Sequence, residues 1–224
     1  MNANLVTQET IKDLITKGVK SLSIAQGTIV TSSAAELAAS NGIQIIEASL
    51  NKPAETPPHS QHPGKSPNPE NKNKGNTVAF GSDHGGFELK EILKKQAESF
   101  GYKIMDVGAY DEKPSDYPEF AYAVARAVAS GDAWRGVMID GAGTGSCVVA
   151  NKVPGIRAAC CHNEFVARNS REHNDTNVLT LGSRVTGTEV CKEILRIWLE
   201  SWFSGGRHKQ RVDKINDVEK KFLK

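Results

Sequence analysis

From residue 77 onwards, short runs of apolar residues alternate with longer segments in which apolar residues recur at helical spacing. The apolar runs predict strands at residues 77–82, 102–108, 135–140, 156–161 and 177–183. The periodic segments predict helices at residues 87–100, 120–130, 147–153, 164–173 and 189–203, the first with Leu89, Ile92, Leu93, Ala97 and Phe100 on one face. Strands that are apolar on both faces and separated by helices are typical of a parallel sheet covered on both sides. The pattern therefore predicts an α/β fold with a five-stranded parallel sheet.

The first 50 residues have a weaker pattern of their own. Helical spacing of apolar residues predicts a first helix, which includes Ile11, Leu14, Ile15, Val19 and Leu22. A second helix is predicted to begin at Ser33, with Glu36 completing a capping box. Asn41 and Gly42 end that helix, and residues 43–48 read as a short strand. Because so small a unit buries little surface, we expect it to fold against a partner or a second copy.

Residues 51–76 separate these two parts. The segment holds six of the nine prolines, several asparagines and no large apolar side chain. Such a composition cannot bury enough surface to offset the entropy of ordering the chain. We therefore predict an N-terminal module at 1–50, a flexible linker at 51–76 and a main domain at 77–224.

Composition excludes several classes of protein. With 38% hydrophobic and 24% charged residues, the 224-residue chain suits a soluble globular protein. The net charge is only +2 and the basic residues are scattered, which argues against a nucleic-acid partner. The N-terminus shows no signal peptide and no apolar run approaches membrane-spanning length. Four cysteines without framework spacing indicate reduced thiols, so we expect a cytoplasmic protein with no membrane partner.

Three polar stretches follow predicted strands, where ligands bind in folds of this class. They are "GSDHGG" at 81–86, "DGAGTGS" at 140–146 and "GSRVTG" at 182–187. Asp140 opens the second stretch as part of a nucleotide-binding turn, as a proton-transfer group or as a helix cap. The spacing G-x-G-x-G, with no carboxylate at the end of the next strand, argues against a dinucleotide cofactor. Alternate glycines still allow backbone amides to approach an anionic oxygen closely.

Other polar groups are candidates for binding or proton transfer. Asp83 is either a helix cap or a site residue, and His84 beside it suits a phosphate ligand or a proton carrier. No metal site is expected, because the sequence has no C-x-x-C or H-x-x-x-H pair. Arg207 and Arg211 are four residues apart, so on a helix they form either a phosphate-binding pair or a solvated basic surface.

Together these stretches resemble a known family. "GSDHGGFELK", "DYP" at 116–118, "ANKVPGIRAA", "HNDTNVLTLGSRV" and "GGRHKQRV" are similar, in this order, to the type B ribose-5-phosphate isomerases, which include the galactose-6-phosphate isomerase subunits. The resemblance covers residues 77–224. It implies a Rossmann-like three-layer α/β/α fold and a homodimer or a dimer of dimers with active sites at the subunit interface. It also implies cofactor-free aldose–ketose isomerisation of a phosphorylated sugar, such as ribose 5-phosphate.

The resemblance also assigns roles by position. His173 would help to open the sugar ring, and Asn174 would steady the enediolate. The substrate pocket would be formed by Asp83, His84, Tyr117, Gly141, Gly143, Gly145, Ser146, Arg207 and Arg211. Among these, the glycine amides would hold the oxyanion, and Arg207 and Arg211, with His84, would bind the phosphate.

The glycine-rich stretch departs from the family. Asp140 stands where many members have a catalytic cysteine, Ser146 where another branch has a glutamate, and Ala142 where a hydroxyl residue assists ring opening. A carboxylate at a strand end is a suitable general base, so we predict Asp140 rather than Cys147 as the base, with Thr144 assisting His173. The alternatives are a catalytically weak sugar-phosphate-binding or assembly protein, or an isomerase for a hexose phosphate.

The N-terminal part lies outside this family. Its stretch "GTIVTSSAAELAASNGIQI" resembles short segments carried by enzymes packaged in bacterial microcompartments. This resemblance implies a module that docks on a shell or cargo protein in the microcompartment lumen. An additional dimerisation element is the alternative.

Overall fold

A computed structural model describes residues 5–25, 28–48 and 76–222. The chain divides into two compact units, Met1–Pro63 and Gly64–Lys224. The boundary between them falls within the segment predicted as a linker, nearly all of which lies outside the described residues.

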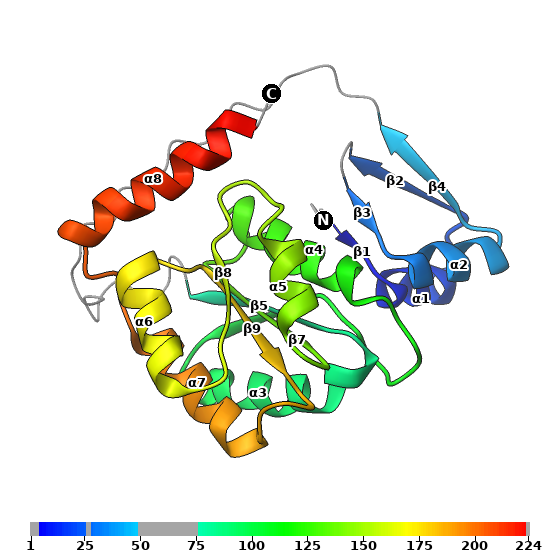
Figure 1. Cartoon of the computed structure of the whole chain (residues 1–224). Coiled ribbons are helices and arrows are strands. Elements are labelled where there is room, and N and C mark those ends of the chain that lie inside the picture. The colour runs from blue at the N-terminus through cyan, green and yellow to red at the C-terminus, as the bar shows by residue number, and fades with distance from the viewer. Residues whose placement is uncertain (1–4, 26–27, 49–75, 223–224) are drawn as a thin grey trace. The chain divides into compact units, whose positions relative to one another are not determined.

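A five-stranded parallel sheet forms the centre of the second unit (Figure 1). Its strands are β5 (Thr77–Ser82), β6 (Lys103–Asp106), β7 (Arg135–Asp140), β8 (Ala158–Cys160) and β9 (Val178–Gly182). Their order in the sheet is β6-β5-β7-β9-β8, and each neighbouring pair is parallel. The predicted five-stranded parallel sheet is confirmed.

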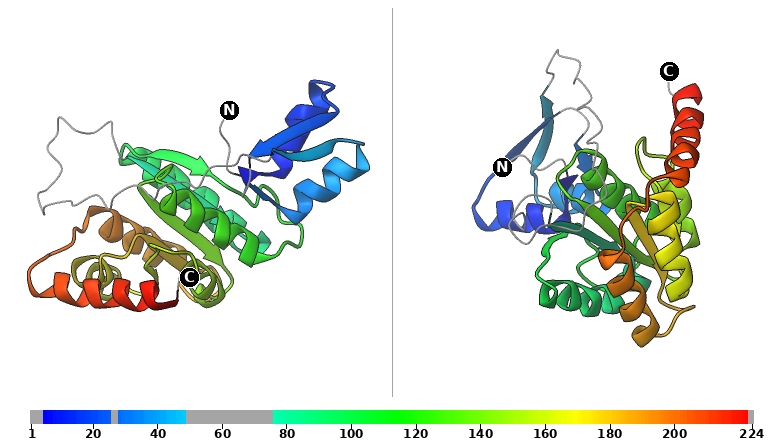
Figure 2. Two further views of the ribbon diagram at one scale, coloured as in Figure 1. Left: turned by 90° about the horizontal axis from the view of Figure 1, so that it is seen from above. Right: turned by 90° about the vertical axis from the view of Figure 1, so that its left-hand side faces the viewer.

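Helices cover both faces of this sheet, as the views in Figures 1 and 2 show. They are α3 (Phe87–Ser99), α4 (Tyr117–Ala129), α5 (Thr144–Ala150), α6 (Glu164–Asn174), α7 (Thr188–Glu200) and α8 (Arg207–Phe222), with the short 3₁₀ helix η2 (His84–Gly86) before α3. One face carries α4 and α5. The other carries α3 and α7, with α6 beside α7 and α8 against α6. This is the predicted three-layer α/β/α arrangement.

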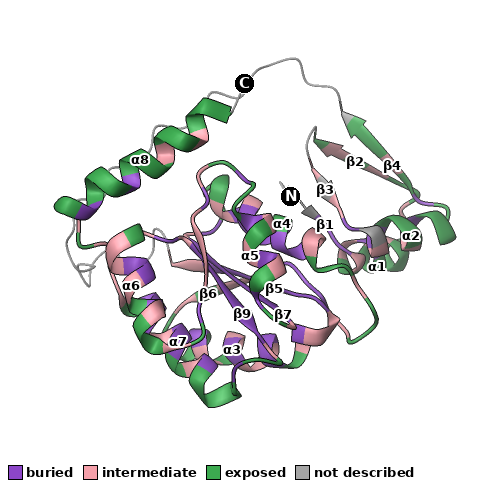
Figure 3. Cartoon of the chain, viewed as in Figure 1, coloured by how far each residue is buried: buried purple, intermediate pink, exposed green. Residues whose placement is uncertain are grey.

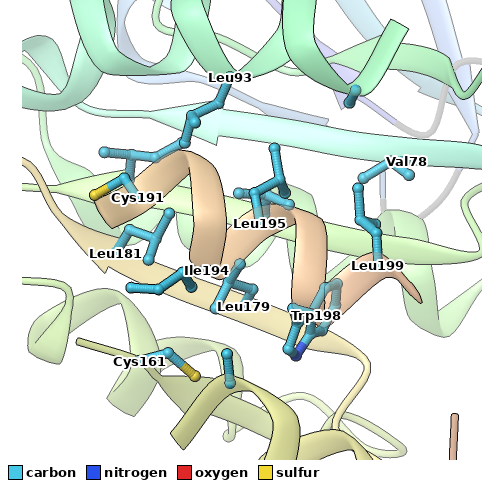
Figure 4. Close-up of a cluster of buried hydrophobic side chains, with 14 of the residues drawn as sticks. Val78, Leu93, Cys161, Leu179, Leu181, Cys191, Ile194, Leu195, Trp198 and Leu199 are labelled. Carbon is cyan, nitrogen blue, oxygen red and sulfur yellow. The ribbon is translucent and has the colours of Figure 1, made fainter. Parts of the chain in front are cut away.

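The main core lies between the sheet and helices α3, α6 and α7 (Figure 4). Ile194, Leu195 and Trp198 of α7 are fully buried against strand residues. Each such side chain contributes about 1.5–3 kcal/mol when it leaves water. Trp198 also places its indole N–H 3.1 Å from Thr176 Oγ1, so its polar atom is satisfied. Colouring by burial shows the central strands β5, β7 and β9 buried and the outer helix faces exposed (Figure 3).

Helix α3 differs from its predicted face. Leu89, Leu93 and Ala97 are buried, but Phe100 is 40% exposed because the helix ends at Ser99 and Phe100 is its C-cap. Lys90 is fully buried instead. Its ammonium donates to both carboxylate oxygens of Asp106 and to the Ala109 carbonyl, which satisfies the buried charge.

The first unit consists of two similar βαβ halves. The first half is β1 (Leu5–Val6), α1 (Gln8–Thr16) and β2 (Ser21–Ala25), and the second is β3 (Ile29–Val30), α2 (Ser32–Ser40) and β4 (Gln44–Ala48). The pairs β1–β3 and β2–β4 are parallel. Buried Val6, Ile11, Ala34, Ala38 and Ile43 form its core.

Two predictions for this unit were wrong. Helix α1 ends at Thr16, and the chain turns at Gly18 (φ 67°), so Leu22 belongs to β2 rather than to a long helix. Helix α2 is capped by Thr31, whose Oγ1 accepts from the Ala34 amide at 3.2 Å, and not by Ser33. The helix does end at Asn41, and the predicted strand is β4.

Candidate active site

Three loops meet at the carboxyl ends of β5, β7 and β9. The Asp83 amide donates to the Ile139 carbonyl at 3.2 Å, which joins the loop after β5 to β7. The Ser183 amide donates to the Asp140 carbonyl, and the Ser183 hydroxyl to the Gly85 carbonyl, both at 2.8 Å. Strand β5 lies between β6 and β7, so this is the point where the strand order reverses and open α/β sheets bind their ligands.

Asp140 lies beneath the glycine-rich loop and is 4% exposed. Its Oδ1 accepts from the Ala142 amide at 2.8 Å and from the Gly143 amide. Its Oδ2 accepts from the Ser146 amide at 3.1 Å and from the Ser146 hydroxyl. These four hydrogen bonds hold the turn that precedes α5. One of them satisfies the Ser146 amide in the first turn of α5, so Asp140 acts as a helix-capping side chain.

Gly143 is required by this turn. Its φ is +80°, and a Cβ here would lie 2.9 Å from Cys160 Sγ and 3.0 Å from the Leu181 carbonyl carbon. Ser146 is buried, whereas Thr144, the first residue of α5, is exposed. The loop thus presents Thr144 to solvent and keeps the Asp140–Ser146 contact inside.

Asp83 and His84 are held at the start of η2. Asp83 Oδ1 accepts from the Gly86 amide at 2.9 Å, so the predicted capping contact is present. Burial raises the pKa of Asp83; the charge of Asp140 adds to this, while the Gly86 amide and His84 oppose it. His84 Nδ1 accepts from the Ser115 amide at 3.2 Å, and the His84 amide donates to Ser115 Oγ at 3.0 Å. With Nδ1 bound to the protein, Nε2 is the nitrogen left for a ligand.

Tyr117 lies directly on the glycine loop. A Cβ on Gly145 would come within 2.7–2.9 Å of the Tyr117 ring and hydroxyl, so a side chain here would displace the phenol from its position on the loop. Tyr117 is 38% exposed, which places an aromatic face and a hydroxyl at the rim of the site.

Arg184 belongs to the same region, although sequence reasoning did not single it out. Its Nη2 is 3.8 Å from the Cβ position of Gly85, and its Cδ is 3.8 Å from that of Gly141. Its amide donates to the Gly141 carbonyl at 3.1 Å. The signal was present in the stretch at 182–187, which follows β9, but it was not assigned to a particular side chain.

His173 and Asn174 lie at the opposite edge of the sheet. They end α6, which runs back toward the amino ends of the strands. The Asn174 carbonyl accepts from Arg157 Nε at 3.1 Å, and the Arg157 carbonyl accepts from the Asn177 amide directly before β9. Because Asp140 lies at the carboxyl end of β7, one chain does not bring His173 and Asp140 together.

Helix α8 adds further polar groups to this amino edge. Arg207 and Arg211 are both exposed and one turn apart, as expected if the stretch is helical. His208, between them, is buried and stacks on His173 with ring centroids 4.0 Å apart. The predicted site residues therefore form two groups, a carboxyl-edge group (Asp83, His84, Tyr117, Asp140, Gly141, Gly143, Thr144, Gly145, Ser146) and an amino-edge group (His173, Asn174, Arg207, Arg211).

Cys147 lies inside α5, as predicted. Its thiol is 3.5 Å from the Ala158 carbonyl of β8 and therefore points along the sheet side of the helix. Burial raises the pKa of this thiol.

Among the described residues, no group of three or more His, Cys, Asp or Glu side chains is placed to hold a metal ion. Within the same residues, no helix has the length and apolar character needed to cross a bilayer.

The chain is similar to several known proteins. Over 144 residues the chain is 44% identical to ribose-5-phosphate isomerase B of Escherichia coli, covering 64% of this chain and 97% of that protein. It is 40% identical over 146 residues to D-erythrulose-4-phosphate isomerase of Pectobacterium atrosepticum, covering 64% of this chain and 95% of that one. The solved structure of Clostridium thermocellum ribose-5-phosphate isomerase B has 48% identity and a TM-score of 0.65, covering 66% of this chain and 99% of that chain.

A family model described as Ribose/Galactose Isomerase matches residues 78–215, which is more than half of the chain and includes both groups of site residues. The chain belongs to this family and is an aldose–ketose isomerase.

Proposed function

We propose that this protein interconverts ribose 5-phosphate and ribulose 5-phosphate through an enediolate, without a cofactor. The observation that carries the proposal is that the polar side chains which the reaction needs lie in two clusters, one at each end of the strands. Carboxylates, His84 and the glycine loop gather at the carboxyl edge, while His173, Arg207 and Arg211 lie at the amino edge. Two of the relatives described above are named ribose-5-phosphate isomerase B.

The two groups form one site when two copies of the chain pair. In a two-fold dimer the amino edge of one copy faces the carboxyl edge of its partner, and the arrangement repeats by symmetry. Helix α8 supports this pairing, because its apolar side chains Ile215 and Val218 are 46% and 55% exposed in the single chain and a partner would cover them. We propose a homodimer, or a dimer of such dimers, with two shared sites per pair.

Within this shared site each side chain has a role. His173 opens the sugar by moving the proton of the C1 hydroxyl to the ring oxygen as the bond between C1 and that oxygen breaks, with Thr144 assisting from the partner's loop. Asn174 and the glycine-loop backbone donate to the enediolate oxygens. Arg207 and Arg211, with His84 and Arg184 of the other copy, hold the phosphate dianion, which suits guanidinium pairs.

Asp140 is the base in this proposal. It takes the C2 proton of the open aldose and returns it at C1. Ser146 helps, because its hydroxyl donates to Asp140 Oδ2 and can accept from the same oxygen once the carboxyl is protonated. Cys147 is less suitable, since its pKa is raised by burial and its thiol is directed at the Ala158 carbonyl.

One observation favours a second function. All four hydrogen bonds of the Asp140 carboxylate come from its own loop, and Ala142 replaces a hydroxyl residue of the family. A protein that binds a sugar phosphate and turns it over slowly would have these features. Assays with ribose 5-phosphate, four-carbon sugar phosphates and hexose 6-phosphates separate this alternative from an isomerase for another substrate.

We also propose that the N-terminal unit is a docking module, joined by residues 51–76, that places the enzyme on a microcompartment shell or cargo protein in an otherwise cytoplasmic setting. The resemblance of residues 27–45 to such segments supports this assignment. An additional dimerisation element remains its alternative.

A complementation assay tests the shared site. Co-expressed Asp140→Asn and His173→Ala variants form mixed dimers that contain one intact site, so roughly a quarter of the wild-type activity should return. The matched control combines His173→Ala with Arg207→Ala, which affect the same edge and should restore nothing. No recovery in the first mixture would mean that one chain carries a complete site.

A further inference from the structure

His208 lies over the face of His173 and has no assigned role. The two imidazoles are nearly parallel, with an angle of 9° between their planes and 4.0 Å between their centroids. His173 is in the last turn of α6, and His208 is the second residue of α8. The stack therefore joins two helices at the amino edge.

A hydrogen bond to a ring nitrogen is a second contact that fixes the orientation of the His173 ring. Asn169, one turn earlier on α6, places its Nδ2 2.9 Å from His173 Nδ1. Because the amide nitrogen donates, Nδ1 is the acceptor, and the proton of the neutral ring is on Nε2. Asn169 thus sets the tautomer, and the stacked ring limits rotation out of the plane.

His208 is suited to support rather than to proton transfer. It is 7% exposed, and its Nδ1 is buried with no hydrogen-bond partner among the described residues. The groups that act on it are His173 and Glu172 of α6 and Arg207 and Arg211 of α8. Burial, followed by the charges of His173 and the two arginines, lowers the pKa of His208, against the opposing effect of Glu172. A neutral His208 ring places no positive charge on the face of His173, so charge repulsion does not oppose the stack.

We propose that His208 is a positioning residue, which holds the imidazole of His173 in the orientation that opens the sugar ring. The proposal rests on the isomerase function proposed above. It is specific to one step, because His173 acts on the closed sugar and the base acts on the open chain. Loss of the stack should therefore impair ring opening and leave proton abstraction intact.

Two substrates separate these steps. Ribose 5-phosphate is mostly a closed ring in solution. Ribulose 5-phosphate has no furanose form, because its C5 oxygen carries the phosphate. Turnover of ribose 5-phosphate therefore includes ring opening. Exchange of solvent deuterium into C1 of ribulose 5-phosphate, followed by NMR before aldose accumulates, does not.

In the full-length protein, His208→Ala should lower turnover of ribose 5-phosphate by about tenfold or more, the scale expected when a catalytic group is misplaced. The deuterium exchange should stay within about twofold of wild type. His208→Phe, which keeps a flat ring over His173, should restore most of the lost turnover. Val212→Ala removes packing one turn further along the buried side of α8 and should change both rates equally and little.

Each other outcome contradicts the proposal in a recognisable way. An equal fall in turnover and exchange for His208→Ala would make His208 a support of the whole site. Unchanged turnover would show that His173 needs no stacked partner, and no rescue by His208→Phe would show that a ring nitrogen matters rather than the stack. Wild-type protein that neither turns over ribose 5-phosphate nor exchanges ribulose 5-phosphate would overturn the proposed function, and this proposal with it.

Discussion

Ser146 donates two hydrogen bonds to the same carboxylate oxygen of Asp140, one from its amide at 3.1 Å and one from its hydroxyl. The other oxygen accepts from the amides of Ala142 and Gly143. The carboxylate therefore holds the turn before α5 and also lies at the carboxyl end of β7. Both proposed roles of Asp140 depend on this one arrangement.

Asp140→Asn separates the roles. The NH₂ group that replaces one carboxylate oxygen cannot accept from the loop's donors, so the variant should lose about 1–3 kcal/mol of stability. If Asp140 is the base, turnover measured well below the melting temperature should fall at least about a hundredfold, and solvent-deuterium exchange should fall in parallel. Cys147→Ser should stay within a few-fold of wild type. An active Asp140→Asn with an inactive Cys147→Ser would make the thiol the base and leave Asp140 as a helix cap.

Arg207 and Arg211 are predicted to hold the substrate phosphate. Replacing either by Ala should lower kcat/KM for ribose 5-phosphate by about ten- to a hundredfold. Activity toward a sugar without the phosphate should hardly change. Lys214→Ala, which removes another exposed cation of α8, is the control and should have little effect. Equal losses for both kinds of sugar would indicate a structural role for the arginines.

Asp83 should make stability depend on pH. Burial raises its pKa above the ordinary value of 3.8, so the folded protein holds this proton more tightly than the unfolded chain. Its contribution to stability is therefore complete below pH 3.8 and is lost as the pH rises through the raised pKa. Asp83→Asn keeps the acceptor for the Gly86 amide but does not ionise.

Urea unfolding between pH 3 and pH 7 measures this difference, with about two pH points per unit. As the pH rises above 3.8, the free energy of unfolding of Asp83→Asn should increase relative to that of wild type. Glu112→Gln changes an exposed carboxylate and should leave the pH profile unaltered. Parallel profiles for Asp83→Asn and wild type would contradict the prediction.

Residues 77–224 should fold and catalyse without the first 76. The second unit has its own sheet and core, and relatives of nearly this length match it over 95–97% of their chains. The shortened protein should retain kcat/KM for ribose 5-phosphate within a few-fold, measured beside the full chain. A soluble shortened protein that loses more than about tenfold would place part of the N-terminal unit in the active site.

Local sequence pattern was sufficient for most of the second unit. The five strands and α7 appear where the apolar pattern predicts them, because a side chain's face on a strand or helix follows from its own spacing. The pattern was insufficient where contacts with other residues decide which side chain caps a helix or becomes buried. Thr31 rather than Ser33 caps α2, and Lys90 is buried because Asp106 and the Ala109 carbonyl satisfy its charge.

The sequence by itself also determined which residue types are available for chemistry, and it placed Asp83 and Asp140 at strand ends. Only the tertiary structure decided that Asp140 is enclosed by its own loop, that Arg184 reaches the loops after β5 and β7, and that His173 stacks on His208. It also separated His173 from Asp140, since a helix that follows a parallel strand returns its end to the opposite edge of the sheet. The Arg184 and His173–His208 contacts join segments distant in sequence, which the spacing of residues along one segment does not encode.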